Sequence, residues 1–70
     1  MTLNEASAGN EYVVAKINTE DEEMKDFLFS LGCYSGETVS VVSIKNSGLV
    51  VSIKDGRYCI DSLLAQAIEV

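Results

Sequence analysis

The chain has 70 residues with 11 acidic and five basic side chains, and its formal net charge is −6 at pH 7. Five scattered cations disfavour binding to nucleic acid or anionic lipid, because both require clustered lysine and arginine. A hydrophobic content of 47% argues against disorder, and the length predicts one small domain over residues 1–70. The sequence contains no histidine, so the usual general base is missing and we expect no enzyme and no catalytic residue.

The first residues lack the basic and apolar regions of a secretory signal, and no apolar run is long enough to span a bilayer. We therefore expect a cytoplasmic protein without direct membrane insertion. Cys33 and Cys59 are then expected to be reduced and to serve as small, buried apolar residues. Two thiols without histidine are an incomplete tetrahedral set, so we expect no metal ligand and no cofactor.

Residues 12–17 predict a first strand, with Val13, Ala15 and Ile17 on its buried face. A short helix then extends from about Glu20 to Leu31. Thr19 and Glu22 have the spacing of a capping box, and Gly32 stands where a left-handed residue ends a helix. One apolar face follows the spacing i, i+3, i+4 and i+7, and consists of Met24, Phe27, Leu28 and Leu31.

The first turn of this helix is acidic, which complements the positive end of the helix dipole. A cation site is the alternative interpretation. It is disfavoured because consecutive residues on a helix point in different directions and their carboxylates do not converge. The acidic residues are Glu20, Asp21, Glu22, Glu23 and Asp26.

Residues 37–45 predict a second strand, with Val39 and Val41 on one face and Val42 and Ile44 on the other. A period of two cannot change face without an irregularity, so we expect a bulge or bend near Val41 and Val42. A turn at residues 46–48, with Gly48 in the left-handed conformation, leads to a third strand.

The third strand alternates clearly, with buried positions at Leu49, Val51 and Ile53. Asp55-Gly56 predicts a type I′ hairpin turn into a fourth strand at residues 57–60. Asp61 or Ser62 can cap a single helical turn, and residues 67–70 form the last strand, with Ile68 and Val70 inward. The predicted fold is mainly β, a small five-stranded barrel with one short α-helix between strands 1 and 2.

Phe29 lies off the main helix stripe, and Cys33 and Tyr34 lie in the loop that follows the helix. Exposed apolar side chains close to one another mark a partner surface, so Phe29, Cys33 and Tyr34 are our candidate partner-binding residues. The alternative is that the two aromatic side chains simply cover one end of the barrel.

Three segments, in order and at fitting distances, resemble the FeoA family of small cytosolic accessory proteins of bacterial ferrous iron uptake. They are TLNEASAG at residues 2–9, LGCYSGE at residues 31–37 and AQAIEV at residues 65–70. Two features depart from the family pattern. Ser35 replaces a proline common before Gly36, and the strands after that loop are less basic than is usual in the family.

The resemblance implies an SH3-like barrel and, as partner, the FeoB-type membrane G-protein permease. The domain would dock onto the permease and regulate it, and weak self-association is the other interaction that this interpretation allows. Proline-rich peptides are not expected ligands, because their binding depends on an aromatic-lined groove and the chain has no tryptophan and few tyrosines. The alternatives are a metal-responsive regulatory domain, related to the C-terminal module of iron-dependent repressors, and a ferrous iron chaperone, which the missing histidines oppose.

Overall fold

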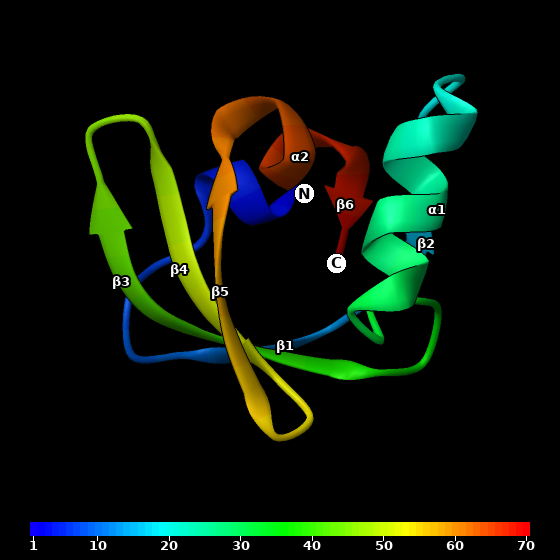
Figure 1. Cartoon of the computed structure of the whole chain (residues 1–70). Helices are drawn as coiled ribbons and strands as arrows, with labels where there is room; N and C mark the ends of the chain where they lie inside the picture. Colours follow the sequence, from blue (N-terminus) through cyan, green and yellow to red (C-terminus); the bar gives the residue numbers. More distant parts are fainter.

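A four-stranded antiparallel sheet forms the largest layer of the structure (Figure 1). The computed structural model describes all residues, 1–70. In spatial order, the strands of this sheet are β1 (Glu11–Val13), β3 (Thr38–Lys45), β4 (Gly48–Ile53) and β5 (Gly56–Asp61). A second antiparallel sheet pairs β2 (Lys16–Ile17) with β6 (Ile68–Glu69).

Three helical segments complete the fold. A 3₁₀ turn, η1 (Leu3–Glu5), and α2 (Ser62–Ala67) lie together at one end of the strongly curved large sheet, and α1 (Glu22–Ser30) stands at one side (Figure 1). The prediction of a mainly β fold is confirmed. The prediction of one five-stranded barrel with a single helix is wrong in detail, because there are six strands in two sheets and two α-helices.

The predicted first strand is divided in two because the chain changes partner within two residues. The Val14 N–H donates to the Glu37 carbonyl at 2.8 Å, next to β3, whereas the Ala15 N–H donates to the Glu69 carbonyl at 2.6 Å, in β6. This change of partner alters the expected inward set. Val14 is buried, whereas Val13 is 59% exposed and Ala15 is also exposed. Only Ile17 of the predicted set packs against the core, where it is half-buried.

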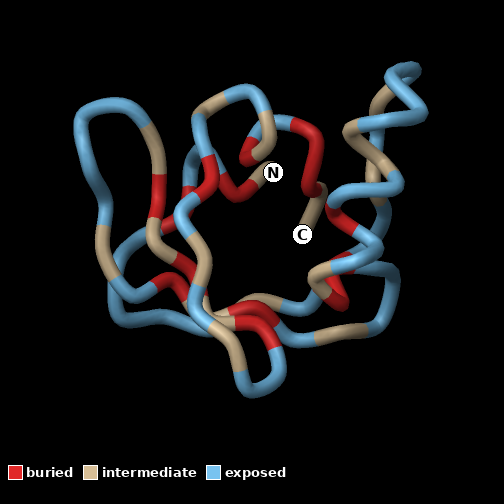
Figure 2. Tube along the Cα trace, in the orientation of Figure 1, coloured by how far each residue is buried: buried red, intermediate tan, exposed pale blue.

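The core fills the space enclosed by the curved sheet, η1, α2 and the inner side of α1 (Figure 2). All of its fully enclosed side chains are apolar, as expected where burial is the main stabilising term. The buried members are Leu3, Ala6, Val14, Leu28, Cys33, Val39, Val41, Leu49, Val51, Ile53, Ile60, Ala65, Ala67 and Ile68. The predicted inward positions Leu49, Val51, Ile53 and Ile68 are confirmed, and Val70 is half-buried.

The predicted irregularity in the strand of residues 37–45 is confirmed. The register of β3 against β4 shifts between Val41 and Ser43, so Val42 is the extra residue of a β-bulge. Val39 and Val41 are buried before the bulge, whereas Val42 and Ile44 are largely exposed. The bulge therefore lets β3 bury Val39 and Val41 in the core and then bend, so that the next two hydrophobic side chains, Val42 and Ile44, stay exposed.

Both predicted hairpin turns are shifted by about one residue. Gly48 already belongs to β4 and has no positive φ; glycine is required there because a Cβ would overlap the Ile60 carbonyl on the neighbouring strand. The second loop is Lys54-Asp55, since Ile53 pairs with Gly56. Lys54 has a φ of 53°, so the left-handed residue of this turn is a lysine.

The helix caps differ from the predicted ones at α1 and agree at α2. Asp21, not Thr19, is the N-cap of α1, and one carboxylate oxygen of Asp21 accepts from the N–H groups of Glu23 and Met24 at 3.0 and 3.2 Å. The Thr19 hydroxyl instead accepts from the Asp21 N–H at 3.1 Å. Asp61 caps α2 by accepting from the Leu64 N–H at 2.9 Å, as predicted.

Candidate partner-binding site

The last turn of α1 and the loop after it bring the predicted site residues together. The Gly32 N–H donates to the Phe29 carbonyl and the Cys33 N–H to the Leu28 carbonyl, both at 3.0 Å. These two bonds form a Schellman motif, and the predicted left-handed residue is confirmed by the φ of 90° at Gly32. The helix end is therefore fixed by its own backbone, and the direction of the following loop is fixed with it.

Cys33 points into the core and is fully buried, together with Leu28. Burial raises the pKa of the Cys33 thiol to about 11. A side chain with no exposed surface cannot touch a partner, so the structure places Cys33 beneath the candidate partner-binding surface and not on it. Its role is to anchor the loop from below. The expectation that both cysteines are buried holds for Cys33 only, because Cys59 is exposed; both thiols are free.

Phe29 and Tyr34 form an aromatic pair on the surface. Their ring centroids are 6.4 Å apart and the ring planes meet at 83°, an edge-to-face arrangement. Phe29 is 45% exposed and Tyr34 is 38% exposed. The pair therefore joins a residue from the last turn of α1 to one from the loop, and it offers a rigid apolar surface to solvent.

Lys54, at the tip of the β4–β5 hairpin, places a cation on this aromatic pair. Its Nζ lies 5.5 Å from the centroid of the Tyr34 ring and 3.3 Å from Oε2 of Glu37. The hydrogen bond to Glu37 is the main cause that raises the pKa of Lys54, and the contact with Tyr34 acts in the same direction. The two partners hold the ammonium group charged and in one position.

The stem of Lys54 also packs on the end of α1. A Cβ built on Gly32 would lie 2.8 Å from Lys54 Cε and 3.0 Å from Cδ. Glycine at this position thus has two functions, since it adopts the left-handed conformation and leaves room for the lysine stem. A Cβ at this position would have to displace the end of the lysine side chain from the helix end.

These elements border an open cleft of about 510 Å³, which we call the Tyr34 cleft. One wall is the end of α1 with its loop, and the other is the β4–β5 hairpin. The lining residues are Phe29, Ser30, Leu31, Gly32, Tyr34, Ile53, Lys54, Asp55, Gly56 and Tyr58. The cleft combines aromatic surface with one fixed cation, a composition suited to binding another protein.

The sequence interpretation did not identify Lys54, Glu37 and Tyr58 as parts of this site. The hairpin tip lies about 20 residues beyond Tyr34, and nothing local indicates that it folds back onto the helix end. The position of the two-residue loop is the signal that could have identified Lys54. A hairpin loop at Lys54-Asp55, instead of the predicted Asp55-Gly56, places Lys54 at the exposed tip.

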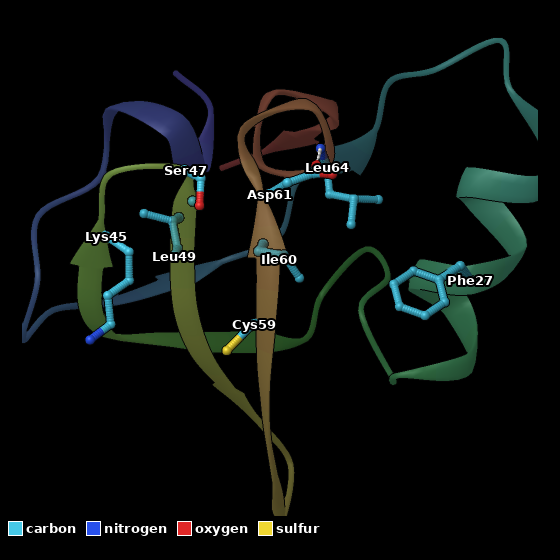
Figure 3. A pocket seen from close by; sticks show the side chains of 9 residues that line it. Phe27, Lys45, Ser47, Leu49, Cys59, Ile60, Asp61 and Leu64 are labelled. Atoms are coloured by element: carbon cyan, nitrogen blue, oxygen red, sulfur yellow. Dashed lines mark hydrogen bonds between the residues drawn. The ribbon is translucent and has the colours of Figure 1, made fainter.

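A second groove, of about 350 Å³, lies between α1 and the far ends of β4 and β5 (Figure 3). Figure 3 shows the ring of Phe27 directed from α1 toward Ile60 and Leu64 across this space. Phe27 was predicted to be on the buried face of the helix, but it is 47% exposed. The helix stands away from the sheet at this height, so that Leu28 carries the core contact instead.

No helix of the structure is long and apolar enough to cross a membrane. The chain has no histidine, and nowhere in the structure do three or more cysteine, aspartate or glutamate side chains form a group that could hold a metal ion. The acidic first turn of α1 is thus a capped helix end, with the Asp21 carboxylate bonded to backbone N–H groups.

The sequence profile of the FeoA domain matches residues 1–70. The chain belongs to the FeoA family. A search of curated proteins found no match. Among solved structures, an iron uptake regulatory protein (FeoA) has 25% identity and a TM-score of 0.84, with 97% of this chain and 93% of that chain covered.

Two other solved structures share the fold. The FeoA of Stenotrophomonas maltophilia, described as an SH3 domain protein complexed with zinc, has 23% identity and a TM-score of 0.87, with 99% of this chain and 87% of that chain covered. A manganese-dependent transcriptional repressor has 24% identity and a TM-score of 0.88, but only 39% of that chain is covered, against 97% of this one. Membership of the FeoA family supports a role in iron transport or its regulation, whereas these two structures show the shared fold.

Proposed function

We propose that this FeoA domain is a non-enzymatic, cytosolic accessory protein of ferrous iron uptake that docks onto the cytosolic part of a FeoB-type membrane G-protein permease through the Tyr34 cleft. The observation that carries the proposal is the exposed Phe29–Tyr34 pair, held in place by a backbone-fixed helix end and by the Lys54 ammonium group. Rigid, partly exposed aromatic side chains are the residues that most often dominate binding energy at interfaces.

The charge of the cleft supports a partner segment that carries a carboxylate beside an apolar side chain. Lys54 lines the cleft and has one ion-pair partner, Glu37, so its ammonium group has donors left for a second carboxylate; Asp55 is the acidic residue of the lining. The aromatic pair would take the apolar side chain of such a segment. The net charge of −6 on the whole domain would steer a partner surface that is basic outside this contact.

The test is a titration of the domain with the isolated soluble G domain and stem of the permease. Tyr34→Ala should weaken binding about 30-fold, because truncating a central aromatic residue costs about 2 kcal/mol. The matched control is Leu63→Ala, which removes a 66% exposed apolar side chain from α2, away from the cleft. Binding that is equal in the two variants, or no binding by the wild type at high micromolar concentration, would contradict the proposal.

Folding of each variant should be checked by circular dichroism before the titration. Tyr34→Ala should retain a native spectrum, because the loop is held by backbone bonds and by buried Cys33 rather than by the tyrosine ring. If Tyr34→Ala unfolds the domain, Tyr34 is a structural residue and the cleft is not the docking surface.

The alternative function is metal binding. The domain would then be a metal-responsive regulatory domain, which the fold shared with the manganese-dependent repressor favours, or a ferrous iron carrier. The side chains described above favour docking instead, because carboxylates and thiols do not converge. Anaerobic calorimetry with ferrous ion separates the two functions. A stoichiometric heat of binding would support the metal-responsive or carrier function.

A further inference from the structure

One long strand of the main sheet has an unpaired edge. On one side β5 pairs with β4, from the pair Ile53 and Gly56 to the pair Gly48 and Asp61. Outside this ladder, no backbone hydrogen bond reaches residues 56–60, and only Asp61, the N-cap of α2, is also bonded to that helix. The groove of Figure 3 opens beside it, with Ile60 on the strand side and Phe27 across the space. The edge is therefore not covered by another element of the same chain, and a free edge is a template for a further strand.

The free backbone groups fall on alternate residues. The two-residue loop makes Ile53 and Gly56 the closing hydrogen-bonded pair of the hairpin, so every second residue of β5 from Gly56 onward bonds to β4. The N–H and carbonyl groups of Arg57 and Cys59, and the N–H group of Asp61, are then directed to the free edge; the Asp61 carbonyl belongs to the first turn of α2. The same three residues have their side chains exposed on the outer face of the sheet.

Their order along the strand is symmetric in charge. Arg57 lies two residues before Cys59, and Asp61 lies two residues after it. We propose that two copies of this chain pair antiparallel along β5, around a two-fold axis that passes through Cys59. In this register Arg57 lies opposite Asp61 of the second copy, and Cys59 lies opposite Cys59 of the second copy.

The inner face of the paired strands is also complementary in this register. Tyr58 lies opposite Ile60 of the second copy, and aromatic and β-branched side chains are a favourable cross-strand pair. A register centred on Tyr58 would instead place Arg57 opposite Cys59, and one centred on Ile60 would place Cys59 opposite Asp61. Only the axis at Cys59 places opposite charges against each other in both symmetric positions.

The self-pairing is weak and depends on concentration. Six residues from each copy bury less surface than a standard stable interface, so the dissociation constant should lie roughly between 0.1 and 1 mM. The net charge of −6 on each copy opposes association, whereas the two Arg57–Asp61 contacts favour it at close range. This association uses β5 and is independent of the proposed docking to a permease.

Sedimentation equilibrium of the full chain, at protein concentrations up to about 1 mM, tests the proposal. The wild type should form dimers, and Arg57→Asp should weaken dimerisation by about tenfold or more, because it sets like charges opposite each other twice. Lys16→Asp is the matched control: it makes the same change in net charge in β2 of the other sheet, at a 64% exposed side chain, and should leave the dimer intact. Asp61→Asn removes the charge but retains a good helix cap, and should also weaken the dimer.

Cross-linking with a short bismaleimide tests the register. Cys59 is exposed and Cys33 is buried, so Cys59 is the thiol that reacts, and the wild type should give covalent dimers. A Cys59→Ser, Lys45→Cys variant carries its exposed thiol at the end of β3 and should give few. A wild type that stays monomeric at the highest concentration, a dimer that survives Arg57→Asp, or equal cross-linking through both positions would overturn the proposal.

Discussion

The two cysteines show how strongly surroundings change one residue type. Cys33 is fully buried beneath the α1 loop, and burial raises the pKa of its thiol to about 11. Cys59 lies exposed on the outer face of β5. The sequence alone assigned both to the core, because free cysteine is usually buried. The difference depends on the strand register, which places Cys59 between inward-facing Tyr58 and Ile60.

The raised pKa of Cys33 predicts a loss of stability at alkaline pH. The unfolded thiol ionises near pH 9, whereas the folded thiol stays protonated up to about pH 11, so the contribution is complete below pH 9 and is lost as pH rises toward 11. The full difference of about two pKa units corresponds to about 3 kcal/mol in the free energy of unfolding. Urea unfolding at a series of pH values measures it.

Cys33→Ala is the control for this prediction. The variant should be less stable at pH 7, by about 1 kcal/mol, because the sulfur leaves a small space in the core. Its stability should nevertheless fall less steeply between pH 9 and 11. Lys54, whose pKa is also raised, stays in both proteins and cancels in the comparison. Parallel pH profiles would show that Cys33 is not the titrating group.

At the scale of elements, the end of α1 determines both the helix and the site. The Schellman motif at Gly32 stops the helix, sends Cys33 inward and leaves Tyr34 beside Phe29. The hairpin tip then rests on the same glycine through the stem of Lys54. One backbone conformation thus places the aromatic pair and the cation relative to each other.

Gly32→Ala should therefore disturb more than the helix end. The positive φ alone should cost about 1–2 kcal/mol of unfolding free energy, and the new Cβ must also displace the Lys54 stem. Gly9→Ala is the matched control, because Gly9 has a φ of 87° and nothing within 4 Å of the added Cβ. Chemical denaturation should show a larger loss for Gly32→Ala, and a loss no greater than that of Gly9→Ala would contradict the packing role.

At the scale of the whole molecule, stability and binding are divided between adjacent residues of one helix. Leu28 is the one residue of α1 that is fully buried in the core, and its neighbour Phe29 is 45% exposed. A domain of this size has a stability of only roughly 4–10 kcal/mol. Leu28 is therefore the main contact of α1 with the core, and Met24 and Leu31 are partly buried beside it.

Leu28→Ala should cost about 2–5 kcal/mol and lower the melting temperature by at least about 10 °C. Phe29→Ala, one residue away, should cost about 1 kcal/mol or less, since Phe29 is 45% exposed and lies outside the buried core. Scanning calorimetry measures both. Similar melting temperatures for the two variants would show that α1 is held by something other than the Leu28 contact.

Local patterns determined the parts of the fold that were predicted correctly. The bulge at Val42, the inward set of β4 and the glycine that ends α1 each depend on residues a few positions apart. Phe29 and Tyr34 could be selected for the same reason, because both belong to one helix end. The hydrophobic period of a strand or helix is clear in the sequence where the element packs against one surface along its whole length.

The errors occur where a distant segment determines the local structure. The strand at residues 12–17 is divided because Ala15 pairs with Glu69, far along the chain. Lys54 became part of the site because its hairpin folds back onto α1. Phe27 is exposed because α1 diverges from the sheet at the height of the groove. Each outcome depends on tertiary contacts that no short window of sequence contains.

The pairing of β2 with β6 also determines when this domain can fold during translation. Ile17 is made early, but its strand partner, Ile68, is made about 50 residues later. Until Glu69 has left the ribosomal exit tunnel, the N–H groups of Ala15 and Asn18 lack their acceptors, the Glu69 and Ala67 carbonyls. Contacts this distant in sequence make folding slow. The nascent chain should therefore expose its apolar residues to chaperones until synthesis has passed its last strand.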